Sequence, residues 1–152
     1  MNKWQFIGIV FSFLLLSACS GDRVFEEFYA LENEKWAISD TAKFSLDLPE
    51  NIQTVPLLAV RFNETYPFSN LYLRLESKDS TGKVIENKLL NVPVFETKSG
   101  MPIGKGFGNS FTKYDTLPFS LNEKVKIITL TQYMRQESVE GLEAVGLKIL
   151  KK

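Results

Sequence analysis

Hydrophobic and polar residues alternate with a period of two along most of the chain. In residues 43–48, for example, Phe44, Leu46 and Leu48 alternate with polar side chains. Successive side chains of a β-strand point to opposite faces of a sheet, so this alternation predicts strands with one buried face. The same pattern recurs in residues 70–77, where every second position from 71 to 75 is leucine.

Turn-forming residues divide this pattern into about eight segments. The cluster Asp79–Gly82 separates residues 70–77 from residues 83–93 and predicts a hairpin. Helical signals are weak, because residues 25–31 fit either one turn of helix or an edge strand, and residues 136–143 contain a glycine and no apolar stripe, which predicts a loop or a single turn. The expected strands are residues 43–48, 55–63, 70–77, 83–93, 105–114, 117–121, 124–134 and 144–150.

Short strands with turn residues about every 8 to 12 positions are typical of all-β proteins. We therefore expect an antiparallel β-sandwich, jelly-roll-like, of about eight strands. No internal repeat or interdomain linker is visible, so residues 25–152 are predicted to form a single β-sandwich domain. A chain of this length buries enough surface to fold without disulfides or metals.

The N-terminal segment has a different pattern. Lys3 precedes an apolar run over residues 4–16, and polar residues follow from Ser20 onward. A membrane-spanning helix needs about 20 apolar residues, whereas a short apolar run after a positive charge is typical of a signal peptide. The segment is therefore expected to direct export.

Residues 16–19 read Leu-Ser-Ala-Cys, which resembles a bacterial lipobox. In a lipobox the cysteine is lipidated and becomes the new N-terminus. Ordinary secretion, with cleavage one or two residues later, is the alternative, but cleavage before the cysteine would put bulky Leu16 where the ordinary signal peptidase prefers a small residue. We therefore predict a cleaved lipoprotein signal peptide over residues 1–18, acylation of Cys19, and a lipidated tether over residues 19–24.

Composition excludes several classes of function. The chain has 152 residues, 18 basic and 18 acidic side chains, no histidine and one cysteine. Balanced and dispersed charge gives no reason to expect nucleic acid as a partner. Without histidine there is no Ser-His-Asp or Cys-His nucleophile and no histidine-containing zinc site. We therefore predict that the protein is not an enzyme, binds no metal and uses no cofactor.

Two chemical patterns in the sequence could oppose that prediction. Paired carboxylates support glycoside hydrolysis in some enzymes, but the sequence does not show which of its carboxylates would pair. The glycines of residues 100–108 resemble a phosphate-binding loop, yet only three residues separate Gly100 from Gly104-Lys105, and Gly106 stands where Ser or Thr is needed. These glycines are better explained by a bulge at a sheet edge. The candidate carboxylates are Glu64, Glu76, Asp115 and Glu137.

Aromatic residues offer a second class of function. They make up 12% of the chain, and sugar-binding sandwiches stack pyranose rings on exposed aromatic faces. The alternative for each residue is packing in the core or at its rim. A carbohydrate-binding lipoprotein is therefore kept as the alternative function. The candidate stacking residues are Trp36, Tyr66, Phe68, Phe107, Phe111 and Tyr114.

Four segments together resemble the GldH family of gliding-motility lipoproteins from Bacteroidetes. They are Arg61–Leu71, with the specific run Tyr-Pro-Phe-Ser-Asn-Leu, then Gly104–Gly108, Gln132–Arg135 and Gly141–Ile149. Their order and spacing, the lipobox and the chain length all match, so the resemblance covers essentially the whole mature chain.

The resemblance implies a non-catalytic structural or assembly component of the gliding-motility and type IX secretion machinery. Its partners would be the lipid bilayer, through acylated Cys19, and other envelope proteins. We expect it on the outer membrane facing the periplasm, because Ser20-Gly21-Asp22 lacks the acidic run that resembles a surface-export signal. The candidate interaction loops contain Tyr66, Pro67, Phe68, Asn70, Lys105 and Phe107.

The loop Tyr66–Asn70 is either a rigid turn whose aromatics lean into the core or a partner-facing loop. A source in Bacteroidetes also implies an O-glycosylation pattern of Asp, then Ser or Thr, then an aliphatic residue or Thr. Thr41, Ser80 and Thr116 fit this pattern, although Asp before Ser or Thr is also ordinary turn chemistry.

Overall fold

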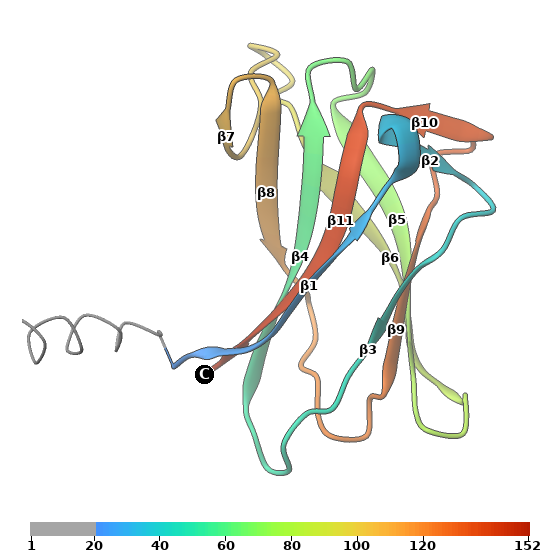
Figure 1. The fold of residues 1–152 in the computed structure, drawn as a ribbon, viewed down its shortest axis with the longest axis vertical. Coiled ribbons are helices and arrows are strands. Elements are labelled where there is room, and N and C mark those ends of the chain that lie inside the picture. The colour runs from blue at the N-terminus through green and yellow to red at the C-terminus, as the bar shows by residue number, and fades with distance from the viewer. Residues whose placement is uncertain (1–20) are drawn as a thin grey trace, which may run out of the picture.

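The computed structural model describes residues 21–152, which form two antiparallel sheets packed face to face (Figure 1). The signal peptide and Cys19 lie outside the described residues. The five-stranded sheet has the order β1-β11-β4-β8-β7, and the four-stranded sheet has the order β3-β9-β5-β6. A small two-stranded sheet, β10-β2, covers one end of the sandwich.

Eight of the eleven strands are longer than three residues. They are β1 (Arg23–Ala30), β3 (Ala42–Ser45), β4 (Thr54–Asn63), β5 (Asn70–Lys78), β6 (Val84–Pro93), β8 (Ser110–Thr116), β9 (Ile127–Gln132) and β11 (Leu142–Lys151). The three-residue strands are β2 (Lys35–Ala37), β7 (Lys105–Phe107) and β10 (Ser138–Glu140), and a 3-10 turn, η2, spans Glu32–Glu34.

The pairing of the eight long strands is that of a jelly roll. The first long strand pairs with the last (β1 with β11), the second with the seventh (β3 with β9), the third with the sixth (β4 with β8) and the fourth with the fifth (β5 with β6). The chain is thus one long hairpin rolled into two sheets, and the prediction of an antiparallel, jelly-roll-like sandwich is confirmed.

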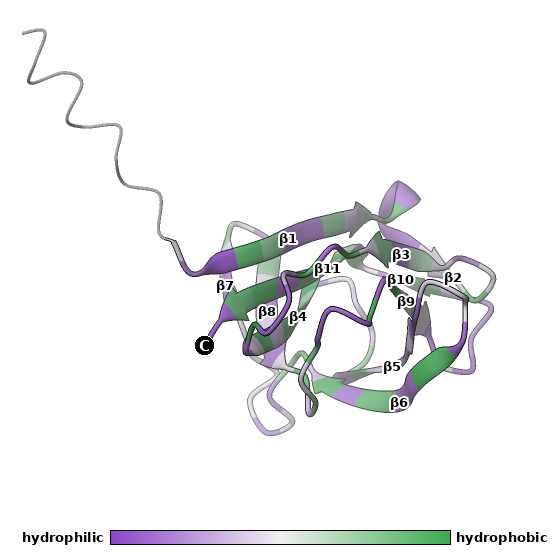
Figure 2. Cartoon of the chain, turned by 90° about the horizontal axis from the view of Figure 1, so that it is seen from below, coloured by the Kyte–Doolittle hydropathy of each residue, from purple (hydrophilic) through white to green (hydrophobic). Residues whose placement is uncertain are grey.

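The core lies between the two sheets and is built from the alternating positions that the sequence shows. The inward leucines of β5, Leu71, Leu73 and Leu75, are fully buried. On the opposite sheet, alternate residues of β4 and β11 are buried in the same way. Seen from below in Figure 2, the strands enclose this interior, and hydrophobic and hydrophilic bands follow one another along β1 and β6. The buried residues of β4 and β11 include Leu58, Val60, Phe62, Val145, Leu147 and Ile149.

Residues 25–31, which fit either a helical turn or an edge strand in the sequence, belong mostly to the edge strand β1. β1 begins at Arg23, within the segment predicted as tether. Residues 105–114 were predicted as one strand, but they divide into β7 and β8 at Gly108, whose φ of 64° permits a tight turn. Residues 136–143, predicted as a loop, contain β10, which pairs with β2.

The predicted strand over residues 117–121 is wrong. This segment crosses from one sheet to the other, and Pro118 has no N–H for a sheet ladder. Its backbone instead bonds to β4, since Leu117 N donates to Pro56 O (2.9 Å) and Leu121 N donates to the Thr54 hydroxyl (3.2 Å). Leu117 and Leu121 are nevertheless buried, which explains why their spacing resembles that of a strand.

Gly141 shows how tightly the β4–β5 loop is packed. Its φ of 75° is in the left-handed region, and a Cβ at this position would overlap the backbone of Tyr66. Gly82 has a similar φ of 85°, but no atom lies within 4 Å of its Cβ position. Substitution at the two glycines therefore distinguishes the cost of a left-handed backbone from the cost of the overlap with Tyr66.

We expect Gly82→Ala to cost about 1 to 2 kcal/mol of unfolding free energy, the strain of a left-handed residue. Gly141→Ala should cost about 1 to 3 kcal/mol more, because the Tyr66 loop must move away from the new methyl group. Urea denaturation of both variants measures the difference. Equal destabilisation would show that the loop yields freely.

Candidate functional site

The outer face of the five-stranded sheet carries the most distinctive side chains of the described chain. Every second residue of β4 points away from the core, toward solvent. The residues that pair with these on β11 and β8 point the same way, and so do the residues that pair with those in turn on β1 and β7. We call this set the outer strip. Its members, from the β7–β8 turn toward the start of β1, are Phe107, Lys105, Thr112, Arg61, Tyr114, Ala59, Gly146, Phe28, Lys148 and Glu26.

Small residues form the floor of the outer strip. Ala59 is fully buried although it faces outward, and Gly146 beside it is also buried. A Cβ at Gly146 would lie 2.8 Å from the Phe28 ring, so glycine lets that ring lie close to the sheet. The guanidinium of Arg61 lies 4.9 Å from the centre of the Phe28 ring. Large side chains at the margins thus cover the small residues at the centre.

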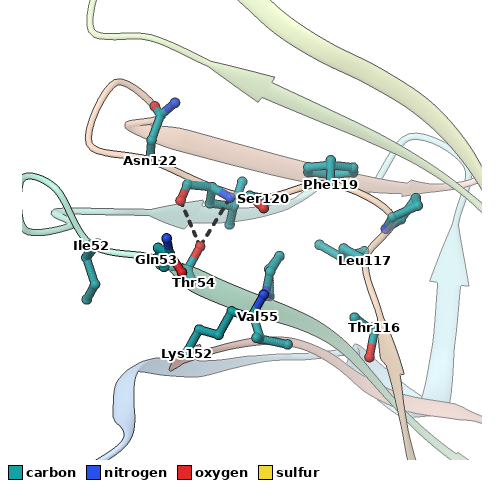
Figure 3. Close-up of a pocket in the computed structure, with 13 residues that line it drawn as sticks. Ile52, Gln53, Thr54, Val55, Thr116, Leu117, Phe119, Ser120, Asn122 and Lys152 are labelled. Atoms are coloured by element: carbon teal, nitrogen blue, oxygen red, sulfur yellow. Dashed lines mark hydrogen bonds between the residues drawn. The ribbon is translucent and has the colours of Figure 1, made fainter.

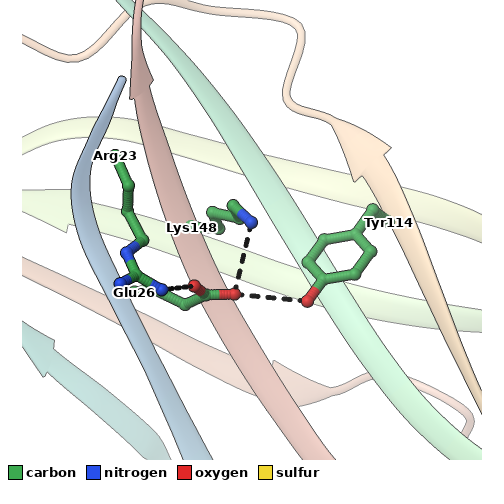
Figure 4. Close-up of polar contacts among 4 residues, drawn as sticks. All are labelled: Arg23, Glu26, Tyr114 and Lys148. Atoms are coloured by element: carbon green, nitrogen blue, oxygen red, sulfur yellow. Dashed lines mark hydrogen bonds and ion pairs between the residues drawn. The ribbon is translucent and has the colours of Figure 1, made fainter. Parts of the chain in front are cut away.

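A charged network occupies the end of the strip near the start of β1 (Figure 4). Glu26 accepts a hydrogen bond from Arg23 Nη1 (2.8 Å), forms an ion pair with Lys148 Nζ (3.5 Å) and accepts one from the Tyr114 hydroxyl (3.3 Å). The Arg23 bond is the main cause of a lowered pKa for Glu26, and partial burial opposes it. The pKa of Tyr114 is raised, mainly by burial and then by Glu26. The charges at this end are therefore paired.

The charges at the other end of the strip are not neutralised in the same way. A cavity of about 480 Å³ there is lined by Arg61, Ile103, Gly104, Lys105, Thr112, Lys113 and Tyr114. No carboxylate is among the lining residues. Lys113 pairs with Asp115 (2.9 Å), but Arg61 and Lys105 form no ion pair with any carboxylate of residues 21–152. Arg61 instead donates to the Thr112 hydroxyl (3.2 Å).

Phe107 follows the cavity residue Lys105 by two positions in β7, and it is 96% exposed, more than any other large hydrophobic residue of the described chain. It precedes the turn of the β7–β8 hairpin and pairs with Ser110, which pairs with Asn63 on β4. At the start of β1, Arg23 pairs with Leu150 of β11, which pairs with Val55 of β4, eight residues before Asn63. Eight residues of strand span about 26 Å, so Phe107 lies near the end of the sandwich away from the start of β1.

The loop Tyr66–Asn70, for which a rigid turn and a partner-facing loop are the two alternatives, packs its aromatic residues inward. Tyr66 is 3% exposed, its hydroxyl donates to Asn70 O (2.8 Å), and burial raises its pKa. Its ring contacts Phe68 edge-on (5.8 Å between centroids) and stacks on Phe95 (6.4 Å). Pro67 is exposed. Tyr66 therefore acts in packing, and only the outer rim of this loop is available to a partner.

The aromatic residues considered for sugar stacking do not form one exposed platform. Trp36 is fully buried and its Nε1 donates to Asp40 O (3.0 Å). Phe111 is partly buried and lies 6.0 Å from Phe62. Phe107 and Tyr114 alone among the six candidates count as exposed.

The candidate carboxylates are likewise separated in the fold. Glu76 belongs to β5 and pairs with Lys78, Asp115 belongs to β8, and Glu64 and Glu137 are exposed in two loops. Within residues 21–152 no group of three or more acidic or cysteine side chains is placed to hold a metal ion.

The candidate glycosylation residues Thr41, Ser80 and Thr116 are all exposed, and the side chain of Asp79 accepts bonds from Thr81 and Lys83 within its turn. The described chain also contains no helix that is both long and apolar enough to span a bilayer.

A second cavity, of about 610 Å³, lies where β4 begins and the 116–122 segment passes it (Figure 3). The Thr54 hydroxyl fixes this segment, because it donates to Leu121 O (2.7 Å) and accepts from Leu121 N (3.2 Å). Lys152 is its only charged lining residue. No sequence pattern indicates this cavity, because the alternation in residues 117–121 predicts a strand. The cavity lining holds no pair of groups suited to acid–base chemistry.

The Glu26 network predicts a pH-dependent contribution to stability. A carboxyl group whose pKa is lowered by folding stabilises the folded state above its ordinary pKa, and the contribution is lost as the pH falls through the lowered value. Glu26→Gln should therefore reduce stability at pH 7 by less than about 1 kcal/mol, and the difference from wild type should decrease below pH 4.5 and vanish once the pH has fallen through the lowered pKa of Glu26.

Urea denaturation between pH 3 and pH 7 measures this difference, with Glu27→Gln as the control because Glu27 is exposed and forms no ion pair within residues 21–152. A Glu26→Gln effect that is the same at pH 3 and pH 7 would contradict the role of the network.

Comparison with known proteins gives consistent matches over nearly the whole chain. The family model "GldH lipoprotein" matches residues 23–149. The gliding motility lipoprotein GldH homolog of Christiangramia forsetii is 28% identical, over 93% of this chain and 92% of its own length. The gliding motility lipoprotein GldH of Flavobacterium johnsoniae is 26% identical, over 91% of each.

Among solved structures, the PRD1 vertex protein P5 aligns with a TM-score of 0.46 and 10% identity, covering 87% of this chain and 99% of that one.

The family match spans most of the chain and agrees with the segments identified in the sequence. The chain therefore belongs to the GldH lipoprotein family, a family of lipid-anchored cell-envelope proteins of gliding motility.

Proposed function

We propose that this protein is a non-catalytic assembly component of the gliding-motility and type IX secretion machinery. In this proposal acylated Cys19 holds it on the periplasmic side of the outer membrane, and the outer strip binds another envelope protein. The observation that carries the proposal is the exposure of Phe107 at the end of the sandwich away from the start of β1. Phe107 lies two residues from Lys105, which lines a cavity together with Arg61. Family membership supplies the cellular process.

A single exposed hydrophobic residue is common on protein surfaces, so exposure alone would carry little weight. Phe107 differs because an arginine and a lysine without carboxylate partners lie beside it on the same face. Aromatic residues and arginine are enriched at the centres of protein interfaces. A glycan is the alternative ligand, but the burial of Trp36 and Tyr66 removes two of the rings that would have stacked on sugars.

A non-catalytic role is consistent with the distribution of reactive groups. The candidate carboxylates lie on separate elements, and no buried polar side-chain atom within the described residues lacks a hydrogen-bond partner. Active sites commonly depend on titratable groups held close together in a cleft. The outer strip instead offers a fixed surface of aromatic and charged side chains, which suits recognition.

Lipid anchoring is tested by Cys19→Ala. Each buried methylene of an acyl chain contributes about 0.8 kcal/mol to membrane binding, so loss of all the chains should move the protein from the membrane fraction to the soluble fraction. Immunoblots of fractionated cells after a carbonate wash measure this. Cys19→Ala protein that stays in the washed membranes would show that something other than the lipid holds it there.

Partner binding is tested by Phe107→Ala. Loss of this ring should reduce the recovery of specific envelope proteins by about tenfold or more when tagged protein is purified from its own cells, because a fully buried aromatic anchor contributes about 1.4 kcal/mol or more. Leu89→Ala is the matched control, since Leu89 is 53% exposed on β6 of the other sheet. Equal recovery with Phe107→Ala and wild type would exclude the outer strip as the binding surface.

A further inference from the structure

We propose that the cavity beside β7 accepts a carboxylate side chain from an extended acidic segment of the partner protein, while an apolar side chain two residues away in that segment packs on Phe107. This inference rests on the proposed function and specifies the chemistry of the partner. The ligand is a protein segment, whose acidic side chain enters the cavity and whose apolar side chain packs on the exposed Phe107 ring.

The charge of the cavity carries the first part of the inference. Arg61, Lys105 and Lys113 line it without any carboxylate, and only Lys113 is neutralised, by Asp115. Two carboxylates elsewhere on this face have hydrogen-bond or ion-pair partners of their own. Glu26 is held by Arg23 and Lys148, and Glu143 accepts a hydrogen bond from Ser110 (2.7 Å). Of the cations that line the cavity, Arg61 and Lys105 are thus left to complement an acidic ligand.

The spacing of β7 carries the second part. Lys105 and Phe107 are two residues apart in one strand, so their side chains lie on the same face, separated by about 6.6 Å along the strand. Alternate residues of an extended segment have the same spacing. A segment that lies along β7 therefore presents an acidic residue to Lys105 and an apolar residue to Phe107 at once. β7 is the edge strand of its sheet in the described chain, which leaves its outer side open.

The site is held in place before any ligand arrives. Arg61 is fixed from two sides, by the Thr112 hydroxyl and by the Phe28 ring. Gly106 lies so close to β8 that a Cβ would overlap Ser110 O and the Phe111 ring, which keeps β7 tight against β8. A fixed site loses less conformational entropy on binding than a mobile one, so few contacts suffice for specific recognition.

The partner segment is identified by photo-crosslinking. Phe107 is exchanged for the photoreactive p-benzoylphenylalanine, which keeps an aromatic side chain, in the full-length lipoprotein in its own cells. The cross-linked peptide, sequenced by mass spectrometry, should contain Asp or Glu within about two positions of the cross-linked residue, as the strand spacing requires. Cross-links only to lipid or glycan, or to peptides without an acidic residue, would overturn the inference.

Charge reversal then tests the pairing. Lys105→Glu should reduce recovery of the partner by about tenfold, and Lys105→Arg should leave it near the wild-type level. Changing the cross-linked acidic residue of the partner to lysine should restore binding to the Lys105→Glu protein. Lys43→Glu is the matched control, because Lys43 is an exposed lysine of β3 on the other sheet. Melting temperatures of the variants check that each one folds.

The outcomes separate this inference from the proposed function. If Phe107→Ala abolishes recovery of the partner and Lys105→Glu does not, a protein still binds the outer strip but no acidic side chain enters the cavity, and the inference fails alone. If neither change affects recovery, both the inference and the proposed binding surface fail. Loss with both changes, together with rescue by the reversed charge, supports both.

Discussion

The pairing of β1 with β11 is the constraint on which the rest of the molecule depends. It joins residues from opposite ends of the chain, with Phe28 opposite Gly146 and Glu26 opposite Lys148. The other long-strand pairs nest inside it, ending with the local hairpin of β5 and β6. Such long-range pairing closes large loops, which is entropically expensive and slows folding. The buried rows of β4, β5 and β11 provide the hydrophobic free energy that offsets this cost.

The same pairing creates the outer strip. Because β11 lies between β1 and β4, Gly146 sits beside Ala59, and no large side chain rises from the centre of the sheet. Arg61 of β4 reaches over this floor to Phe28 of β1, and Lys148 of β11 reaches to Tyr114 of β8, which gives two cation–π pairs. A larger residue at position 146 would lift the Phe28 ring and release the arginine that stacks on it. The position of Arg61 thus depends on a glycine of the neighbouring strand.

Local pattern predicted the strands well wherever one face is buried and the other is solvated. Leu71, Leu73 and Leu75 alternate with polar residues, and all three point into the core as expected. The prediction failed at residues 117–121, because alternate burial also occurs in a crossover loop whose N–H groups bond to β4. The short strands β2 and β10 were missed because three residues are too few to establish a period.

Pattern also located part of the candidate site. Lys105, Phe107 and Tyr114 were noted in the sequence, whereas Arg61 and Phe28 were not assigned to a surface. Their relation depends on strand order, which no local pattern contains. One signal was present, since Arg61 is the one charged residue in the otherwise apolar run of residues 55–62. The inward rings of Tyr66 and Phe68 could not be distinguished from exposed ones, because aromatic residues in a turn have the same composition in either orientation.

The division of charge along the outer strip links the fold to the proposed mode of binding. Near the start of β1, Arg23, Glu26 and Lys148 form a paired network. About 13 Å along β4 from the level of the Glu26–Lys148 pair, Arg61 and Lys105 have no carboxylate partner within the described chain, and their positive charge therefore acts on whatever approaches that part of the strip. A lipid-anchored protein cannot search space freely, so its encounters depend on the surfaces that it exposes. Unpaired cations beside an exposed ring attract and orient an acidic segment before the ring is buried, and this order of events favours selectivity over affinity.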